Sequence, residues 1–456
     1  MLNISNSDIK KSDIITDGDT IYYDITLVRK PMTCPYCGGK MIGHGHKLRL
    51  IKHPAIRNHS GIIRCNANRY ICKECNKTAI EKNPFSFPGF NSSFLLLQNA
   101  MRLLANLNYT LSMISDELDI SSTQLSTYID SYITIPARTL PECLGIDELH
   151  SKELPRRNSG YLCILVDNEK HSLYDILDSR SKMNLSLYLS GFPKEQRCKV
   201  KYVTIYMWEP YKDAAKTYFP NCIIAVDPFH VVKHLHSNFD RLRIDLMNQC
   251  EYGSNAYYLL KKWSRLLVTD NVNLDNERVY NRRFHTWLNR RDLKDMLFDS
   301  FPVLKQAYEL KESYRRMNRE YSYEDAAAHC DKISDRFRRC GITQYEEFTN
   351  ILFTWKEEIL NSFLRPYNNR KLSNAYTENI NSQLRTYLSV SRGISNFSRF
   401  RKRAIYALSP DIRYALTSTL SDCRQNIKKN AVRIIKQEIK IIKTALKTTF
   451  TVALSA

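Results

Sequence analysis

Four cysteines in two closely spaced pairs are the first residues of this 456-residue chain whose spacing could support chemistry. Cys34 and Cys37 form one CxxC pair, and Cys72 and Cys75 form the second. Each pair can hold two thiolates about 3.5 to 4 Å apart on a tight turn, as tetrahedral zinc requires. The segment 38–71 between the pairs must then form a strand hairpin. Because four ligands leave no open position, the sequence predicts a structural zinc site.

Other residues of the same segment could replace one of these ligands, and the four cysteines could also be free and buried. The candidate substitutes are Cys65, His44 and His46. The other cysteines are mostly scattered, and their total of 13 is odd, so reduced thiols are expected in place of a disulfide framework.

Two acidic residues far apart in the sequence could share a metal site. Asp147 closes an apolar run and is expected on a central strand, whereas Glu378 lies in a predicted helix. The small polar side chains around Glu378, in residues 373–381, could position a nucleic-acid backbone. Two-metal phosphoryl transfer needs acidic ligands from separate segments, because two cations about 4 Å apart must be held and charge-balanced. A strand Asp and a distant helix Glu suit that chemistry.

The elements that must position Asp147 alternate between strands and helices. Strands are predicted at residues 143–149, 160–166, 172–177, 201–207 and 222–226. Helices are predicted at residues 181–189, 210–218 and 228–250. Three antiparallel strands followed by strand–helix units resemble a ribonuclease H-like core, so the expected fold class is α/β.

A second pattern upstream of this core predicts a DNA-reading element. Residues 111–129 have the helix, short turn, helix form of a helix-turn-helix, in which residues 121–128 form the recognition helix. Ser122, Thr123 and Gln124 would then face the bases. The alternative is an ordinary pair of packed helices, which gives similar periodicity.

The charge balance favours a polyanionic partner. Lys and Arg number 68 against 47 Asp and Glu, a net charge of +21, which attracts nucleic acid through its counterion atmosphere. There is no apolar run of about 18 residues and no signal pattern at Met1, so a soluble, cytosolic, nucleoid-associated protein without a membrane partner is expected.

Several motifs occur together in one known family. They are VTIYMWEPY (203–211), FPN (219–221), DPFHVV (227–232), SNAYTENIN (373–381) and the basic sequence 385–403. With the CxxC pairs, they make the chain resemble bacterial insertion-sequence transposases of the ISL-three group, relatives of the Mutator-like DDE transposases. The resemblance covers about residues 30–410. It implies an enzyme that binds terminal inverted repeats and uses Mg²⁺ or Mn²⁺ for strand cleavage and strand transfer, besides structural zinc.

The resemblance also implies roles for single residues. Asp147 resembles the first catalytic Asp and Glu378 the final Glu, while Asp227 and His230 match a DxxH element that supports the site. The second acid is expected at the end of the fourth predicted strand, where this chain has Tyr206. A phenol with a pKa of about 10 is a poor ligand for magnesium at neutral pH.

Three explanations of Tyr206 stay open. The substitution has inactivated this copy, or Asp227 on the adjacent strand is itself the second metal ligand beside Asp147 and Glu378. In the third explanation the protein persists as a catalytically inactive DNA-binding regulator. The residue types alone do not choose among these.

Basic residues after the final acid are expected to contact DNA phosphates. They are Arg385, Arg392, Arg399, Arg401, Lys402 and Arg403. The expected partners are double-stranded DNA, as transposon ends and target, and a second copy of the chain. The domain plan is a zinc-binding module (1–85), a helix-turn-helix region (90–138), the first part of the core (139–250), an all-helical insertion (251–370), the final core helices (371–410) and basic amphipathic C-terminal helices (411–456).

Overall fold

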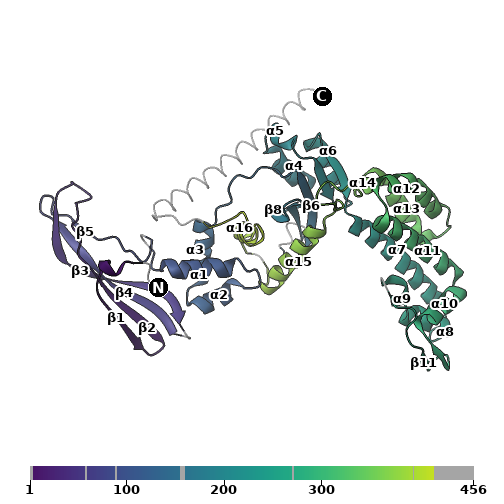
Figure 1. The fold of residues 1–456 in the computed structure, drawn as a ribbon, viewed down its shortest axis with the longest axis horizontal. Coiled ribbons are helices and arrows are strands. Elements are labelled where there is room, and N and C mark those ends of the chain that lie inside the picture. Colours follow the sequence, from purple (N-terminus) through teal and green to yellow (C-terminus); the bar gives the residue numbers. More distant parts are fainter. Residues whose placement is uncertain are drawn as a thin grey trace, which may run out of the picture. The chain divides into compact units, whose positions relative to one another are not determined.

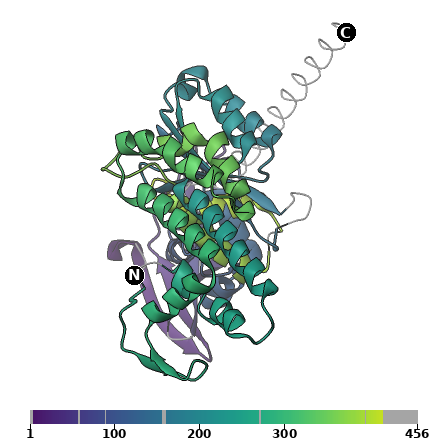
Figure 2. The same ribbon diagram turned by 90° about the vertical axis from the view of Figure 1, so that its right-hand side faces the viewer.

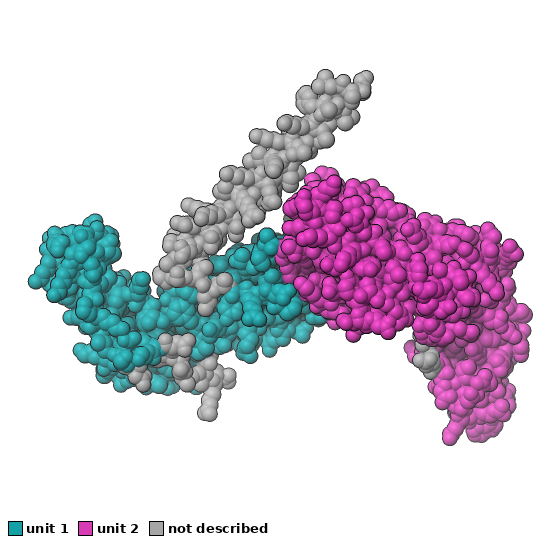
Figure 3. Space-filling model, turned by 45° about the horizontal axis from the view of Figure 1, so that its top comes forward, with its two compact units in different colours: residues 1–137, 383–456 teal, residues 138–382 magenta. Residues whose placement is uncertain are grey.

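The computed structural model describes residues 4–56, 59–87, 90–154, 160–269, 272–393 and 395–414. The chain divides into two compact units, which Figure 3 colours separately. Unit 1 combines residues 1–137 with 383–456, and unit 2 consists of residues 138–382. Unit 2 is therefore inserted in the sequence of unit 1. The C-terminal helices predicted for 411–456 lie outside the described residues beyond Tyr414.

A five-stranded sheet forms the N-terminal part of unit 1 (Figure 1). Its strands are β1 (Ile9–Asp17), β2 (Thr20–Leu27), β3 (Met41–Ile56), β4 (His59–Cys72) and β5 (Thr78–Ile80). The strand order is β1-β2-β4-β3, and β5 pairs with β4. Ile63, Cys65 and Ala67 of β4 are buried at every second position, as the period of a strand requires. In the antiparallel β3–β4 hairpin Met41 lies opposite Cys72, so the start of β3 and the end of β4 lie side by side.

Three short helices follow the sheet. They are α1 (Phe94–Leu104), α2 (Leu111–Leu118) and α3 (Ser122–Tyr132). Ser93, Thr110 and Ser121 cap them, since each side chain accepts a hydrogen bond from a backbone N–H of the first turn. Asp119, with a left-handed φ of 49°, ends α2 and turns the chain toward α3. The predicted helix–turn–helix segment is thus a real pair of helices.

A helix from far downstream belongs to the same unit. The sequence predicts that residues 371–410 are the final helices of the ribonuclease H-like core, but α16 (Phe397–Leu408) lies in unit 1, and the unit boundary falls within α15 (Ala375–Val390). The reason is a set of hydrogen bonds from the buried Arg403 guanidinium to carbonyls of the α1–α2 loop region. The acceptors are Leu104, Asn106 and Tyr109, at 3.0, 3.1 and 2.6 Å.

Unit 2 is built around a second five-stranded sheet. Its strands are β6 (Cys143–His150), β7 (Tyr161–Asp167), β8 (Ser172–Leu177), β9 (Tyr202–Ile205) and β10 (Ile223–Val226). Their order is β10-β9-β6-β7-β8, in which β6, β7 and β8 are antiparallel neighbours and β9 and β10 run parallel to β6. The helices that accompany the sheet are α4 (Lys182–Ser190), α5 (Lys194–Arg197), α6 (Glu209–Tyr218) and α7 (Pro228–Gln249). The unit is therefore of mixed α/β class.

Helices predominate between α7 and α15, and Figure 2 shows them gathered together. They are α8 (Asn255–Lys262), α9 (Arg265–Val268), α10 (Arg290–Ser300), α11 (Pro302–Glu320), α12 (Tyr323–Arg338), α13 (Glu346–Thr354) and α14 (Lys356–Asn361). The all-helical prediction for this segment is wrong in one respect, because β11 (Val279–Asn281) and β12 (Thr286–Leu288) form a hairpin. His285, with a left-handed φ of 52°, helps to turn the chain between these two strands, which are too short for an alternating pattern to reveal. Within the described residues, no helix is long and apolar enough to cross a membrane.

Candidate metal centres and nucleic-acid interface

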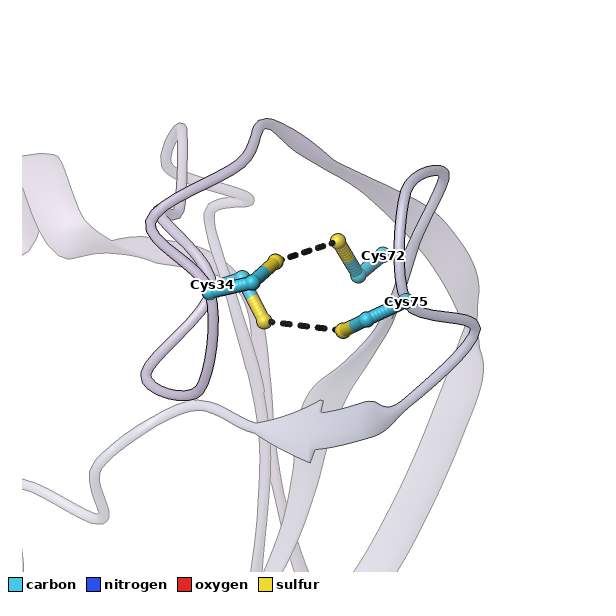
Figure 4. A group of neighbouring side chains, drawn as sticks. Cys34, Cys72 and Cys75 are labelled. Carbon is cyan, nitrogen blue, oxygen red and sulfur yellow. Dashed lines mark hydrogen bonds between the residues drawn. The ribbon is translucent and has the colours of Figure 1, made fainter.

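The two CxxC pairs meet at the end of the β3–β4 hairpin, as Figure 4 shows. The Sγ atoms of Cys34 and Cys75 are 3.6 Å apart, and those of Cys37 and Cys72 are 3.5 Å apart. All four sulfur atoms lie within 4.8 Å of one another, a spacing that suits tetrahedral coordination. Cys65 is fully buried in the sheet core, so it takes no part in the cluster.

The second cluster starts from the register of three parallel strands. Ile146 of β6 pairs with Ile205 of β9, and Ile205 pairs with Val226 of β10. The residue after Ile146 is Asp147, the residue after Ile205 is Tyr206 and the residue after Val226 is Asp227. Adjacent strands in register bring equivalent side chains to one edge of the sheet. Tyr206 therefore stands between two buried carboxylates.

Asp147 is held as a buried carboxylate by two donors. Its Oδ1 accepts a hydrogen bond from the Glu148 backbone N–H at 2.8 Å, and its Oδ2 accepts one from Asn381 Nδ2 at 3.1 Å. The pKa of Asp147 is raised to about 7, chiefly by burial and also by the negative charges of Glu378 and Asp227, while the Glu148 hydrogen bond acts to lower it. Keeping Asp147 ionised in this buried position therefore costs free energy, and a bound cation would offset that cost.

Asp227 lies at the start of α7, with one of its oxygens engaged. Its Oδ1 accepts a hydrogen bond from the Asn374 backbone N–H at 3.2 Å, while its Oδ2 is buried without a hydrogen-bond partner among the described residues. Burial raises the pKa of Asp227 to about 6. Oδ2 lies 3.7 Å from Nε2 of His230, one turn further along α7. Asp227 thus faces His230.

His230 completes a cluster that the sequence assigned to acids alone. One ligand atom each of Asp147, His230 and Glu378 lies within 4.8 Å of the other two, and His230 Nε2 is 3.5 Å from Glu378 Oε1. Burial lowers the pKa of His230 to about 4, so the imidazole is neutral and its nitrogen can bind a metal. The ring of Tyr206 meets the His230 ring edge to face at 4.6 Å, as expected if Tyr206 points into the cluster.

Three of the polar residues around Glu378 are buried, namely Asn374, Thr377 and Asn381, so the expectation that they position a nucleic-acid backbone is wrong for these three, whereas Asn379 is exposed. The Asn374 side chain accepts a hydrogen bond from Thr204 Oγ1 at 2.5 Å and donates one to the Ile146 carbonyl at 3.3 Å. These residues tie α15 to the strands that carry Asp147 and Asp227.

One residue in the Gly-Ile-Asp-Glu sequence could have revealed this packing. A Cβ on Gly145 would come within 3.0 Å of Asn374 Oδ1 and 2.8 Å of Asn168 Nδ2. Only glycine leaves room for the two amide side chains against β6. A glycine inside a buried strand therefore marked the position where another segment approaches closely, two residues before Asp147.

The residues predicted to bind DNA fall into two groups. Ser122, Thr123, Arg385 and Arg392 are exposed, and Arg401 is half-buried. Gln124 donates its amide to Ser92 and to Tyr128 Oη, Arg399 forms an ion pair with Asp130 at 2.8 Å, and Lys402 donates to the Asp130 carbonyl at 3.1 Å. The prediction for Arg403 is wrong, because its side chain is buried and its guanidinium is occupied by carbonyl groups.

Comparison with known families shows two matches that together include both clusters. Residues 144–404, more than half of the chain, match the ISL3 family model described as "Transposase". Residues 30–75 match the model described as the zinc-finger of transposase IS204/IS1001/IS1096/IS1165. The chain belongs to the ISL3 transposase family.

Similarity to one curated ISL3 relative is more distant. The chain is 22% identical over 265 residues to the transposase for insertion sequence element IS1001 of Bordetella parapertussis. The alignment covers 58% of this chain and 64% of that relative, so it spans less than two thirds of the relative's length.

The two ISL3 family matches contain both clusters. The longer match begins within β6 before Asp147 and ends within α16 after Glu378. The shorter match ends at Cys75, the last residue of the four-cysteine cluster. The predicted membership in this transposase group is confirmed, and the zinc-finger match together with the four converging sulfur atoms supports a structural zinc ion.

Proposed function

We propose that this ISL3-family protein is the transposase of its own insertion sequence, which cleaves and transfers DNA strands with a divalent metal. The observation that carries the proposal is the convergence of Asp147 and Glu378, from β6 and α15. The strand order of unit 2, with three antiparallel strands and two more parallel to the first, supports a ribonuclease H-like core. Carboxylates from separate segments of such a core suit metal-dependent phosphoryl transfer.

In this proposal the side chains position groups and do not react covalently. Asp147 and Glu378 supply oxygen ligands to Mg²⁺ or Mn²⁺, and Asn381 orients the Asp147 carboxylate. A bound divalent ion lowers the pKa of water and neutralises charge on a phosphate. Asp227 holds the start of α15 through the Asn374 N–H and keeps its second oxygen near His230, where it remains a candidate for the third ligand.

The DNA contacts are assigned to unit 1. The zinc ribbon and the α2–α3 pair, acting as a helix-turn-helix, would bind the terminal inverted repeats. Ser122 and Thr123 are exposed at the start of α3, where a recognition helix reads bases. Arg385 and Arg392 are exposed and available to phosphates. A homodimer is proposed because two transposon ends must be brought together.

One observation favours a second candidate function. Tyr206 stands between Asp147 and Asp227 at the strand ends, and burial raises its pKa above the ordinary value, so the phenol stays protonated. A protonated phenol neither balances the charge of a cation nor binds it well. The alternative is therefore a catalytically inactive DNA-binding protein derived from a transposase.

Strand cleavage of the element's end sequence separates the two functions. Purified protein is assayed with Mg²⁺ beside Tyr206→Asp and the matched control Tyr206→Phe. If this copy is inactivated, we expect Tyr206→Asp to raise the cleavage rate by a factor of about 100 or more, since a missing metal ligand costs several kcal/mol. Tyr206→Phe should not change the rate.

The other outcomes have distinct meanings. Cleavage by the parent that disappears in Asp227→Asn would assign the second acid to Asp227. Specific binding of the end sequence without cleavage by any variant would support the inactive DNA-binding protein. If the protein binds the end sequence no better than unrelated DNA, the proposed function is wrong.

A further inference from the structure

The acid cluster consists of Asp147, His230 and Glu378, with Tyr206 and Asp227 beside them. Its ligand atoms do not match a site for two magnesium ions. Tyr206 stands where the second acid is expected, and Asp227 has one oxygen committed to the Asn374 N–H. Its other oxygen faces His230 Nε2 at 3.7 Å. Two Mg²⁺ ions need a surplus of carboxylate oxygens, because Mg²⁺ demands near-octahedral oxygen coordination. The three side chains that converge are instead two carboxylates and one imidazole.

Within the part of the chain that the structure describes, two buried atoms in and beside this cluster lack the hydrogen bonds that buried polar atoms normally make. The side chain of His230 is 9% exposed, and its Nε2 has no hydrogen-bond partner among the described residues. Asp227 Oδ2 is buried and in the same condition. Nε2 also lies 3.5 Å from Glu378 Oε1, and His230 offers a ring nitrogen within 4.8 Å of the Asp147 and Glu378 ligand atoms. A cation at this point would give the orphaned nitrogen a partner.

We infer that the site binds one divalent transition-metal ion through Asp147, His230 Nε2 and Glu378, and that it prefers Mn²⁺ to Mg²⁺. An imidazole nitrogen is a good ligand for first-row transition ions, whereas Mg²⁺ selects oxygen ligands and keeps its water. The inference rests on the proposed function for what the bound metal does, but the binding of the metal can be measured without any DNA.

The imidazole is held in place by its neighbours, which favours a preformed site. Tyr206 packs edge to face on the His230 ring, and Phe229 meets the same ring at 5.4 Å between centroids. The aromatic ring of Tyr206 is thereby assigned a positioning role in this chain. Because the ring, and not the hydroxyl, makes this contact, Tyr206→Phe should keep the metal affinity.

Electron paramagnetic resonance of Mn²⁺ tests the inference on the full chain with its zinc site loaded, since Zn²⁺ gives no signal. We expect one Mn²⁺ per chain, with Mg²⁺ competing at least about ten times more weakly. His230→Gln should lower the Mn²⁺ affinity at least about tenfold. The matched control is His234→Gln on the same helix, whose imidazole lies 3.9 Å from Glu347 and outside the cluster. It should change the affinity less than twofold.

Further variants keep the test decisive if His230→Gln fails to fold. Glu378→Gln should weaken Mn²⁺ binding in the same way, because Glu378 is half-exposed and its loss leaves no buried void. Tyr206→Asp should raise the stoichiometry toward two ions and improve binding of Mg²⁺. Tryptophan fluorescence checks that each variant is folded, since all four tryptophans lie in unit 2.

Several results would overturn the inference. They are no bound Mn²⁺, two ions per parent chain, equal affinities for Mg²⁺ and Mn²⁺, or Mn²⁺ binding that survives both His230→Gln and Glu378→Gln. Failure of the proposed function looks different. If the chain binds one Mn²⁺ through His230 and never cleaves DNA, the metal site is supported and the proposed cleavage is wrong. If the chain cleaves DNA with Mg²⁺ and His230→Gln does not change the rate, the proposed cleavage is supported and the metal site is wrong.

Discussion

The zinc cluster and the acid cluster are built in opposite ways. One hairpin brings the four cysteines together, and their four thiolates would complete the coordination of one zinc ion. The acid cluster takes its side chains from β6, α7 and α15. It contains a carboxylate with a raised pKa, an imidazole with a lowered pKa and a buried nitrogen that has no hydrogen-bond partner among the described residues. The first cluster therefore stabilises the unit that holds it. The second must be held together by the rest of unit 2.

This difference teaches that ligand chemistry alone does not reveal what a cluster does for the fold. Removing a ligand from the closed zinc site should destabilise its surroundings. Removing a buried charge from the acid cluster should stabilise unit 2, as is common where function requires groups that folding disfavours. Three substitutions test this contrast.

The largest effect is expected at the zinc cluster. Cys37→Ser removes one of four ligands, and structural zinc contributes on the order of 10 kcal/mol to small zinc-dependent folds. We expect loss of bound zinc and rapid hydrogen exchange at both CxxC turns, measured by elemental analysis and mass spectrometry. Cys340→Ser, at a half-buried cysteine of unit 2, is the control and should keep zinc. Full zinc content in Cys37→Ser would show that the site is misassigned.

A stabilising substitution is expected at the acid cluster. The pKa of Asp227 is raised to about 6, above the ordinary value of about 3.9, so the native state binds more protons than the unfolded state between about pH 4 and 6. The free energy of unfolding of unit 2 should therefore rise as the pH falls through this window. Asp227→Asn should gain about 2 to 3 kcal/mol at pH 8, and the gain should fade toward pH 4.

Urea unfolding followed by tryptophan fluorescence measures this gain in unit 2. The amide of Asp227→Asn also places a donor toward His230 Nε2, which has no hydrogen-bond partner in the described structure. Asp299→Asn on α10 is exposed and should have no effect at either pH. A loss of stability in Asp227→Asn at pH 8 would contradict the contrast between the clusters.

The smallest effect is expected at the amide that orients Asp147. Asn381→Ala leaves Asp147 Oδ2 without its donor at 3.1 Å, and an unsatisfied buried acceptor costs about 1 to 2 kcal/mol. The same urea unfolding experiment should show this loss. Asn350→Ala, at an exposed position on α13, should stay within about 0.5 kcal/mol of the parent. An unchanged stability in Asn381→Ala would mean that water replaces the amide.

The sequence predicted the features that depend on local pattern. The CxxC pairs give the zinc ligands, because one hairpin suffices to join them. The strand predicted at 143–149 is observed as Cys143–His150, because a buried strand has a continuous apolar run. The motifs also predicted the family correctly. The register of β6 and β9 places Tyr206 beside Asp147.

The features that depend on distant neighbours escaped prediction. The basic stretch that contains Arg403 predicts a phosphate contact, but three carbonyl groups from the α1–α2 region accept hydrogen bonds from its guanidinium. The small polar side chains around Glu378 likewise predict a surface for nucleic acid, but Asn374 and Asn381 are buried. Nothing in the nearby sequence indicates which polar side chain will find buried partners hundreds of residues away.

The split of unit 1 around unit 2 has a consequence during synthesis on the ribosome. The loop carbonyls that Arg403 binds are translated long before Arg403 itself, because residues 138–382 intervene. At roughly 5 to 20 residues per second, that delay is about 10 to 50 s. During this time α1 to α3 lack α16, so the face that α16 later covers is open to other nascent chains. A message truncated after unit 2 would yield a folded core attached to an unfinished N-terminal unit.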